Sequence, residues 1–306
     1  MVKINYLELE HISFSYKKNN TILTNINIKI ESGKIIALLG INGSGKTTLL
    51  KILTGIYKPT SGYIKYNNEQ ITSKNIMQYK AVLGFMPEFL FLYKNMTVQE
   101  ILLLLASLKG YDNYDITDTL KTVFLLEHRN KQIKALSKGM KQRLNLAQAI
   151  IGNPKIILFD EPSNGFDCGS IAMFYHILKN LTTMGAIVLI SSHHLTEIYN
   201  NVDQVLILSN GTIIKHININ TIDYTNEILY KELILKLDDS LDKTTINLLK
   251  NDFPSIIIDN ETFTLLLKVN TKTLIKLITS LITLNIKIND IRLNNKILEE
   301  ILTTLS

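Results

Sequence analysis

The chain has 306 residues, enough for one large domain and a small one with hydrophobic cores of their own. Its formal net charge of +6 fits contact with a nucleotide or an anionic membrane surface, but it is too small to imply nucleic-acid binding. The single cysteine excludes an internal disulfide, and a zinc site made only of protein ligands would need several more ligands. The most apolar run, residues 101–108, is far shorter than the roughly 20 residues that span a bilayer.

The first third of the chain predicts mainly β-strands. Alternating apolar residues indicate two strands at 4–16 and 22–30, and the apolar run 34–40 indicates a short buried strand that ends in glycine. A helix is expected over 44–55, and a turn then leads to a further strand or hairpin at 57–71.

The middle of the chain predicts a mainly helical insertion, from about residue 76 to 153. Within it, Thr97 and Glu100 have the spacing of a capping box at a helix start. Two uniformly apolar strands follow at 155–161 and 186–194. Apolar strands that alternate with helices indicate a parallel sheet covered on both faces.

The last part of the chain changes character from about Tyr224, where the glycines disappear. Its periodicity predicts the order βαββαβ of a ferredoxin-like unit, followed by a closing helix. The strands are expected at 233–237, 255–259, 262–269 and 286–292, and the helices at 242–251, 271–284 and 296–305. We therefore expect a large domain over residues 1–220 and a small accessory α+β domain over 221–306.

The segment GINGSGKTT, which starts at Gly40, matches the phosphate-binding loop pattern G-x-x-x-x-G-K-[ST]. Backbone N–H groups of such a loop and of the following helix surround phosphate oxygens, and glycine permits the close approach. Lys46 is expected to reach the β- and γ-phosphates, and the Thr47 hydroxyl is expected to bind Mg²⁺. The predicted nucleotide ligands of the loop are Gly40, Asn42, Gly43, Ser44, Gly45, Lys46, Thr47 and Thr48.

The strand IILFDEP ends in two carboxylates, Asp160 and Glu161. We expect Asp160 to hold Mg²⁺ through water, and Glu161 to orient or deprotonate the water that attacks the γ-phosphate. An acidic turn after a strand is by itself unremarkable chemistry, but the phosphate-binding loop upstream favours the catalytic interpretation. The expected cofactors are therefore ATP and Mg²⁺.

The helix ALSKGMKQRLNLAQAI, residues 135–150, begins with an unusual set of residues. Ser137 can cap it, but Lys138 and two further basic residues lie at the end that carries partial positive charge and prefers anions. Gly139 is also a poor helix former. The helix start therefore indicates contact with an anion, which could belong to a membrane surface, a nucleic acid or one particular phosphate.

A phosphate-binding loop, a helical stretch with LSKGM and an acidic strand, in this order, resemble the ATP-binding-cassette (ABC) ATPases. LSKGM resembles the family signature LSGGQ, and SNGFD, which ends at Asp167, resembles the D-loop. SSHH resembles the switch segment, with His193 in the switch position. Tyr16 stands where the family has an aromatic residue that stacks on adenine. The resemblance covers roughly residues 4–215 and rests on six motifs in the correct order.

This resemblance implies an α/β fold, a P-loop NTPase of ABC type with a mixed core sheet, an antiparallel β subdomain and a helical insertion. Two cassettes of the family sandwich two ATP molecules, each capped by the signature of the other copy. The implied catalytic residues are Lys46, Glu161 and His193. The implied Mg²⁺ ligands are Thr47, Asp160 and Glu88. The further implied nucleotide contacts are Tyr16, Glu88, Ser137, Gly139 and Asp167.

Three positions depart from the family pattern. Glu88 stands where the family usually has a Gln that senses the γ-phosphate or Mg²⁺, and a carboxylate there can still approach Mg²⁺ or water. The Pro-Glu pair resembles a subset of bacterial single-domain cassettes, including ones linked to drug or bacteriocin self-protection. Lys138 and Met140 replace the second Gly and the Gln of the signature. Residues 166–169 replace the more usual Leu-Asp-Pro of the D-loop.

The implied activity is ATP hydrolysis that powers a separate transmembrane permease, with export favoured over import. We expect a homodimer or heterodimer of cassettes, peripheral to the cytoplasmic face of the cell membrane and without a nucleic-acid partner. The apolar run FLFLY, residues 89–93, is a candidate docking site for the membrane subunit, although packing within the helical insertion explains it equally well. The tail from Tyr224 resembles the C-terminal extension of the same bacterial subset, with a role in dimerisation or regulation left open.

Two other functions are open from the sequence alone. A soluble ABC ATPase could act on ribosomes or DNA without a transporter, and a regulatory protein could bind ATP without hydrolysing it. Translation-type relatives usually carry two cassettes in one chain, and repair types insert coiled coils or zinc modules; neither arrangement is visible. Glu161 argues against a protein that only binds ATP.

Overall fold

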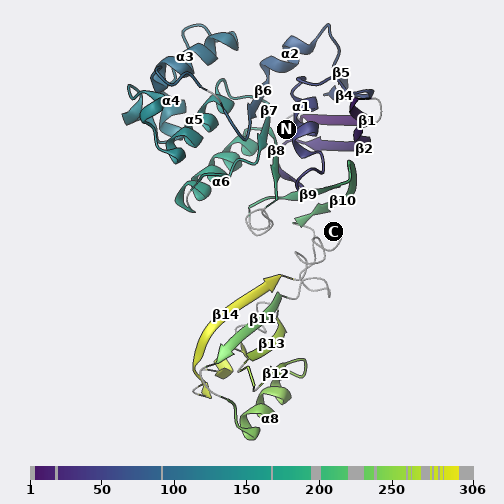
Figure 1. The fold of residues 1–306 in the computed structure, drawn as a ribbon, viewed down its shortest axis with the longest axis vertical. Coiled ribbons are helices and arrows are strands. Elements are labelled where there is room, and N and C mark those ends of the chain that lie inside the picture. The colour runs from purple at the N-terminus through teal and green to yellow at the C-terminus, as the bar shows by residue number, and fades with distance from the viewer. Residues whose placement is uncertain are drawn as a thin grey trace. The chain divides into compact units, whose positions relative to one another are not determined.

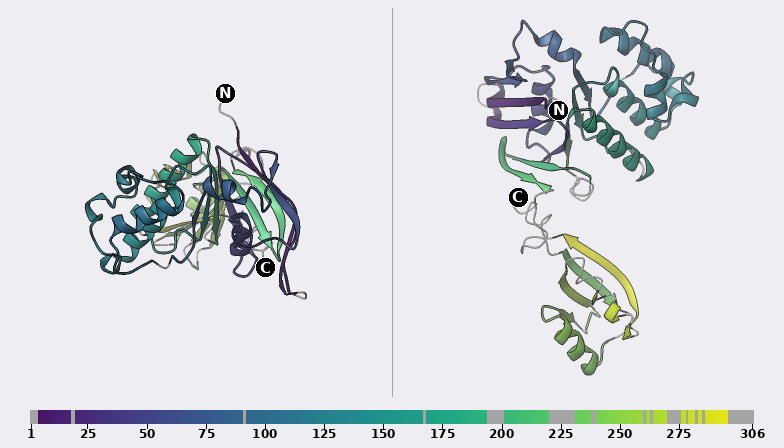
Figure 2. Two further views of the ribbon diagram at one scale, coloured as in Figure 1. Left: turned by 90° about the horizontal axis from the view of Figure 1, so that it is seen from above. Right: turned by 180° about the vertical axis from the view of Figure 1, so that it is seen from behind.

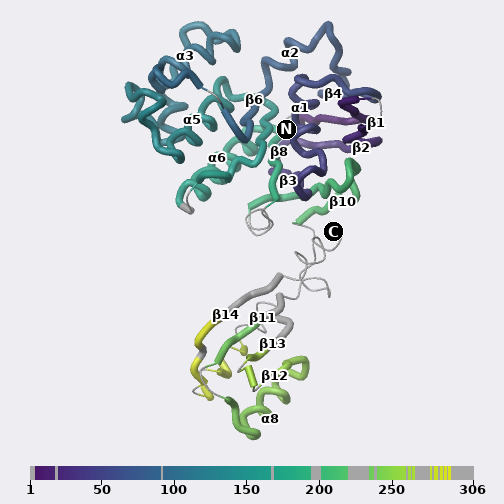
Figure 3. The backbone as a smooth tube through the Cα atoms, viewed as in Figure 1, coloured from purple at the N-terminus to yellow at the C-terminus, as the bar shows by residue number. Residues whose placement is uncertain are grey.

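The structure is a computed structural model with two compact units, Met1–Asn220 and Thr221–Ser306, each of which is considered by itself. Figure 3 traces the backbone of both. The residues that the structure describes are 4–17, 20–90, 92–166, 168–193, 201–219, 231–237, 240–259, 261–262, 264–269, 276–277, 279–281, 283–284 and 286–295.

A six-stranded mixed sheet forms the centre of the first unit. Its order is β10–β9–β3–β8–β7–β6; the strands from β9 to β6 are parallel, and β10 pairs antiparallel with β9. The strands β3, β7 and β8 are buried along their whole length, as expected for a sheet that is covered on both faces. The bounds are β3 Ile35–Leu39, β6 Leu83–Met86, β7 Ile156–Asp160, β8 Ile187–Ser192, β9 Gln204–Ser209 and β10 Thr212–Asn218.

A second sheet of the first unit is antiparallel, with the order β2–β1–β4–β5. Alternate residues of β1, such as Leu7 and Leu9, are buried and join residues of β3 and α1, such as Ile36 and Leu49, in one hydrophobic core. The alternation that predicted these strands therefore comes from one buried face. The bounds are β1 Tyr6–Lys17, β2 Asn20–Glu31, β4 Ser61–Tyr66 and β5 Glu69–Gln70.

The helices α3, α4 and α5 gather on one side of the six-stranded sheet, and β1 and β2 lie on the other (Figures 1 and 2). The predicted capping box at the start of α3 is confirmed, since Glu100 N–H donates to Thr97 Oγ1 at 3.2 Å and Thr97 N–H donates to Glu100 Oε2 at 2.7 Å. The bounds are α1 Lys46–Leu53, α2 Ile76–Ala81, α3 Val98–Leu108, α4 Thr117–Thr122, α5 Lys138–Ile150 and α6 Cys168–Thr183, with short 3-10 turns η1 Leu126–His128 and η2 Ile133–Ala135.

The prediction of a mainly helical segment from residue 76 was wrong for Leu83–Met86, which form β6 at the edge of the six-stranded sheet. Four residues between two helices carry too little periodicity to reveal a strand. The strand has a consequence for the site, because it ends two residues before Glu88 and brings that residue to the carboxyl edge of the sheet.

The second unit contains a four-stranded antiparallel sheet with the order β12–β13–β11–β14, which is the strand order of a βαββαβ ferredoxin-like unit. Its small core includes Leu235, Leu249, Phe253 and Leu281. The helix expected at 271–284 is described only in part, and the closing helix at 296–305 lies outside the described residues. The bounds are β11 Lys231–Leu237, α8 Lys243–Asp252, β12 Ile257–Asp259, β13 Thr264–Val269 and β14 Ile288–Asn295. Of all the helices in the described part of the chain, none combines the length and apolar character that a membrane crossing needs.

Gly84→Ala should destabilise the first unit strongly. A Cβ atom there would lie 2.0 Å from the Ala149 carbonyl oxygen of α5. The variant should therefore lower the free energy of unfolding by about 3 kcal/mol, the upper end of the usual effect of overpacking. The matched control is Gly33→Ala, whose Cβ would meet no atom within 4 Å and whose strain is confined to a backbone φ of +85°. The control should lower the free energy of unfolding by about 1 kcal/mol. Chemical denaturation of both variants measures the difference, and a smaller loss at Gly84 than at Gly33 would contradict the packing of β6 on α5.

Candidate functional site

A cavity of about 370 Å³ gathers most of the predicted site at the carboxyl edge of the six-stranded sheet. Ends of β3, β6, β7 and β8 contribute to it, together with the start of α1 and one residue of β1. Open α/β sheets bind ligands at this edge. The predicted residues that line the cavity are Tyr16, Asn42, Gly43, Gly45, Lys46, Thr47, Thr48, Glu88, Glu161 and His193. Two residues that the sequence did not single out, Ile22 and Asn164, line it as well.

The glycines of the loop after β3 shape the floor of the cavity. A Cβ atom on Gly40 would lie 2.4 Å from the Leu208 carbonyl oxygen of β9, so the loop can leave the sheet there only without a side chain. Gly43 and Gly45 have φ values of +86° and +107°, which are strained for other residues. The loop therefore passes directly into α1 with the amino end of that helix at the cavity, the geometry that binds phosphate.

Lys46 and Ser44 present donors in this loop. The Lys46 side chain is buried, and its Nζ donates to the Gly40 carbonyl oxygen at 2.7 Å and lies 3.5 Å from Glu161 Oε1. The Ser44 hydroxyl is buried and has no hydrogen-bond partner among the described residues. A buried hydroxyl without a partner is unfavourable. Ser44 does not line the cavity, whereas Lys46 does, so the Lys46 ammonium is the side-chain donor that fits the phosphate groups of a nucleotide.

Asp160 and Glu161 are directed apart by a sharp turn at the end of β7. Glu161 has a positive φ of 47°, and its N–H donates to Ser191 Oγ at 3.0 Å. The same Ser191 hydroxyl donates to Asp160 Oδ1 at 2.8 Å, and Thr47 Oγ1 donates to that oxygen at 3.1 Å. Asp160 therefore faces Thr47 behind the cavity wall, whereas Glu161 faces the cavity itself.

Ser191 is the residue of this group that sequence reasoning overlooked. Its register explains its place, because Asp160 pairs with Ser191 in the parallel ladder between β7 and β8. The sequence contains Ser191 in the SSHH segment, but it does not state which strands are neighbours. A small hydroxyl residue at the end of an apolar strand was the available signal.

Asp160 carries the shifted pKa of the site. Burial raises the pKa of the Asp160 carboxyl above its ordinary 3.8, and the hydrogen bonds from Ser191 and Thr47 act in the opposite direction. Burial penalises the charged form, so a cation beside Asp160 would relieve the penalty. Carboxylate and hydroxyl oxygens suit Mg²⁺, so Asp160 and Thr47 together fit the metal that the sequence predicted.

His193 and Tyr16 complete the cavity on two sides. His193 Nδ1 lies 2.8 Å from Glu161 Oε2, which fixes the orientation of the carboxylate that faces the cavity. Tyr16 is half exposed, its hydroxyl lies 3.2 Å from Thr48 Oγ1, and its ring contacts Phe14 edge-on at 5.0 Å between ring centroids. A half-exposed ring that is held on one side leaves a face available for a planar ligand.

The start of α5 does not line this cavity. Ser137 caps the helix, since its hydroxyl accepts from Met140 N–H at 3.2 Å, and the residue is otherwise exposed. The space around Gly139 is open, with the Gly165 carbonyl oxygen at 4.0 Å as the nearest atom to a Cβ placed there. Asp167 lies outside the described residues. Among the predicted nucleotide contacts that the structure describes, the signature residues are thus separate from the cavity within one chain.

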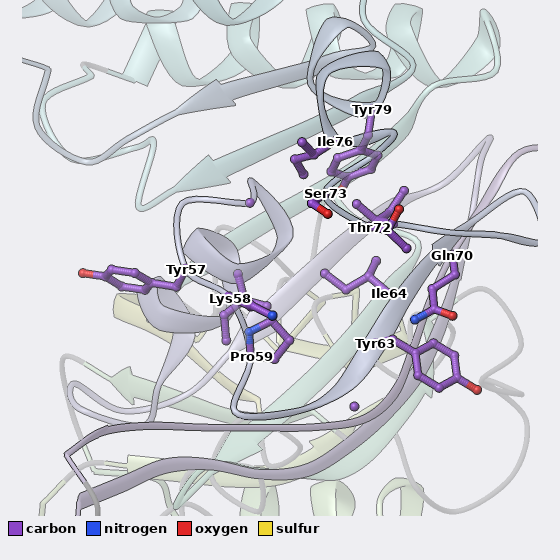
Figure 4. A pocket seen from close by; sticks show the side chains of 14 residues that line it. Tyr57, Lys58, Pro59, Tyr63, Ile64, Gln70, Thr72, Ser73, Ile76 and Tyr79 are labelled. Atoms are coloured by element: carbon purple, nitrogen blue, oxygen red, sulfur yellow. The ribbon is translucent and has the colours of Figure 1, made fainter.

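A second cavity, of about 450 Å³, lies between the end of α1, β4 and α2 (Figure 4). Its walls are largely apolar, with side chains such as Ile64, Ile76 and Tyr79, and none of its lining residues was a predicted site residue. Size therefore does not distinguish the functional cavity; its charged groups and its helix amino end do.

Comparison with known proteins agrees with this geometry. The family model for ABC transporters matches residues 23–164. The lantibiotic transport ATP-binding protein SrtF of Streptococcus pyogenes is 34% identical over 208 residues, which cover 68% of this chain and 89% of that protein. The chain belongs to the ABC transporter ATP-binding family. The bacitracin transport ATP-binding protein BcrA of Bacillus licheniformis is also similar to this ABC cassette, with 36% identity over 194 residues that cover 63% of each chain.

Solved structures show the same fold. The ATP-binding subunit of an ABC transporter is 26% identical, has a TM-score of 0.64, and covers 70% of this chain and 90% of its own. An ATP-binding cassette in its ADP conformation is 25% identical with a TM-score of 0.61, covering 70% of this chain and 91% of its own. The predicted fold class, an α/β P-loop NTPase of ABC type, is confirmed. This ABC cassette is an ATP-hydrolysing transporter subunit.

Asp160→Asn should raise the thermal stability of the nucleotide-free cassette at neutral pH. Because burial raises the pKa of Asp160 in the folded state, the folded protein binds more protons than the unfolded chain between the two pKa values, and stability falls as pH rises through that window. Asn is neutral, and its oxygen can still accept from Thr47 and Ser191. The advantage of the variant should shrink as the pH is lowered and Asp160 takes up its proton.

Thermal melts across mildly acidic to neutral pH measure this effect. Ser191→Ala is the matched control, because it removes a hydrogen bond to Asp160 and leaves the buried charge in place, and it should lower stability at neutral pH. Equal or greater stability of the wild type relative to Asp160→Asn at neutral pH would contradict the interpretation.

Proposed function

We propose that this ABC cassette hydrolyses Mg²⁺-ATP as one half of a cassette dimer and drives export through a separate membrane permease. The observation that carries the proposal is an incomplete site. One cavity gathers the phosphate-binding loop, Glu161 and His193, while Ser137 and Gly139 of the signature stay outside it. The chain then holds two complementary halves of a site that two copies would complete.

The loop and the acidic strand have separate roles in this mechanism. The loop amides and Lys46 hold the β- and γ-phosphates and balance their charge. Thr47 and Asp160, the latter through water, would hold Mg²⁺, and the metal would supply positive charge that neutralises the phosphates. Tyr16 stacks on the adenine ring. The remaining ligands of the nucleotide are Gly40, Asn42, Gly43, Ser44, Gly45 and Thr48.

Glu161 acts on the attacking water. The water oxygen forms a bond to the γ-phosphorus while the bond from that phosphorus to the bridging oxygen of ADP breaks, and a water proton passes to Glu161 Oε1 or Oε2. His193 holds Glu161 through the 2.8 Å contact and lies where it can also meet the γ-phosphate. The buried position of Glu161, which is 6% exposed, keeps this carboxylate away from bulk water.

The signature supplies the other half of the site. Ser137 and the amide of Gly139 stand at a helix start, where backbone N–H groups lack partners within the helix and the dipole favours an anion. The open space at Gly139 lets a phosphate come close to the backbone. A homodimer or a heterodimer with another cassette would place this helix start, and Asp167 beside it, on the nucleotide of the partner.

The membrane contact is proposed for the loop that follows Glu88. Phe89 and Tyr93 are 72% and 70% exposed, so these two aromatic side chains do not serve the packing of the helical insertion. Phe91 lies outside the described residues. Exposed apolar patches commonly mark protein interfaces. We place the cassette at the cytoplasmic face of the membrane, peripheral to the lipid and without a nucleic-acid partner; export is favoured because the similar proteins SrtF and BcrA are named for lantibiotic and bacitracin transport.

Glu161→Gln should lower the steady-state rate of ATP hydrolysis by about 10²–10⁴, the range that a general base contributes. Gln keeps the size of the side chain and loses the proton acceptor, so ATP should still bind and ATP-dependent dimers should accumulate. Phosphate release and size-exclusion chromatography with ATP measure the two effects. Full activity of the variant would exclude Glu161 as the base, and absence of dimers with bound ATP would argue against the sandwich.

Phe89→Glu should uncouple the ATPase from the membrane while basal hydrolysis by the purified chain is retained. A charge on an exposed apolar contact disfavours docking, whereas the Phe89 side chain does not line the nucleotide cavity. Copurification of a membrane protein with the cassette from native membranes, and stimulation of the ATPase by that protein, measure the loss. Phe124→Glu, at a phenylalanine that is 66% exposed in the helical insertion, is the matched control. Normal assembly and transport with Phe89→Glu would refute this docking site.

A further inference from the structure

The signature helix and the D-loop touch each other within one chain through Lys138 and Gly165. A Cβ atom placed on Gly165 would lie 2.7 Å from Lys138 Cε and 3.5 Å from both its Cγ and its Cδ. The aliphatic stem of Lys138 therefore lies across Gly165, which has a φ of +105° and no side chain of its own to cover the turn. With Gly at position 138, as in the family signature, this cover would be missing.

The covered turn also holds Glu88. Asn164, next to Gly165, donates from Nδ2 to Glu88 Oε1 at 3.4 Å, and both residues line the nucleotide cavity. The turn is closed by two backbone hydrogen bonds, from Asn164 N–H to the Glu161 carbonyl oxygen at 3.3 Å and from Phe166 N–H to the Ser163 carbonyl oxygen at 3.1 Å. A long, single contact such as that between Asn164 and Glu88 depends on the turn being held in place.

We propose that Lys138 is a positioning residue: its stem braces the D-loop turn, so that Asn164 keeps the Glu88 carboxylate at the edge of the nucleotide cavity. The proposal rests on the proposed hydrolysis of Mg²⁺-ATP and on the place beside Mg²⁺ that the family resemblance implies for Glu88. Two departures from the family pattern, Glu88 and Lys138, then act together in one arrangement of contacts. A carboxylate close to a phosphate repels it unless the carboxylate meets the metal. Fixing the Glu88 side chain keeps its carboxylate out of the positions where it would repel the phosphate.

The stem of Lys138 carries this role and the charge does not. Lys138 takes part in none of the salt bridges between described residues, whereas its methylene groups lie over Gly165. Long basic side chains often cover apolar or backbone surface with their stems while the charged end stays in water. Methionine has a similar unbranched stem without the charge, so Lys138→Met separates the two contributions.

Hydrogen exchange of the nucleotide-free full chain tests the bracing directly. In Lys138→Gly, amides of the peptide that contains Asn164 and Phe166 should exchange about tenfold faster, and in Lys138→Met they should stay within about twofold of the wild type. Lys141→Gly is the matched control, because it removes another exposed lysine from the first turns of the same helix, and it should leave this peptide unchanged. Unchanged exchange in Lys138→Gly would overturn the proposal, as would faster exchange in Lys138→Met.

Calorimetric titration with ATP, with and without Mg²⁺, tests the consequence at Glu88. Lys138→Gly and Asn164→Ala should each weaken Mg²⁺-ATP binding about three- to tenfold and leave binding of metal-free ATP unchanged. The double variant should be no weaker than either single variant, because both act through one contact. Additive losses, or equal losses with and without Mg²⁺, would overturn the proposal.

Glu88→Gln distinguishes failure of this inference from failure of the function on which it rests. If Glu88→Gln binds Mg²⁺-ATP as the wild type does, the proposed role of Glu88 at the metal is wrong, and the exchange experiment still decides whether Lys138 braces the turn. If Glu88→Gln weakens Mg²⁺-ATP binding and Lys138→Gly does not, the role of Glu88 stands and the positioning role of Lys138 is wrong.

Discussion

The structure depends on holding buried charges of opposite sign at one edge of a parallel sheet. Asp160, Glu161 and Lys46 are 3%, 6% and 6% exposed, and charged groups are rarely buried to this extent unless they are paired. Lys46 Nζ lies 3.5 Å from Glu161, while Asp160 has only neutral hydroxyl donors. The protein part of the site therefore carries an excess of buried negative charge beside a phosphate-binding loop, and a cation bound there would relieve the cost of that excess.

The parallel sheet makes this concentration of charge possible. Strands β3, β7 and β8 are buried along their whole length and are apolar up to the carboxyl ends of β7 and β8, so their ladder fixes the relative heights of the strand ends. Polar residues occupy the last positions of β7 and β8, and the register sets Asp160 opposite Ser191. Glu161 keeps its unfavourable positive φ because the rigid sheet next to it holds the backbone in place, as is typical of strained residues at functional sites.

Local chemistry was predictable from the sequence, whereas contacts across the fold were not. The loop after β3 and the carboxylates after β7 follow from residues adjacent in the chain, and so does the Thr97 cap. Strand β6 was missed because four residues carry little pattern, and Ser191 and Asn164 were not singled out because their partners are set by strand order and by a turn conformation. Lys138 illustrates the limit: its position in the signature suggested a charge near phosphate, and its side chain lies over the D-loop of its own chain.

The loop after β6 connects the nucleotide cavity to an exposed aromatic side chain through two adjacent residues. Glu88 lines the cavity, and the adjacent Phe89 is 72% exposed, so neighbouring residues in one short segment face the nucleotide and the solvent. The Glu88 carboxylate can turn about its side-chain bonds without moving the backbone, so only a movement of the Glu88 backbone reaches Phe89 through the planar peptide that joins them. The hydrogen bond from Asn164 Nδ2 to Glu88 Oε1, at 3.4 Å, limits that side-chain freedom. A side chain held in this way would pass more of any movement at the nucleotide to its own backbone, and so to the exposed aromatic residue, than a free side chain would.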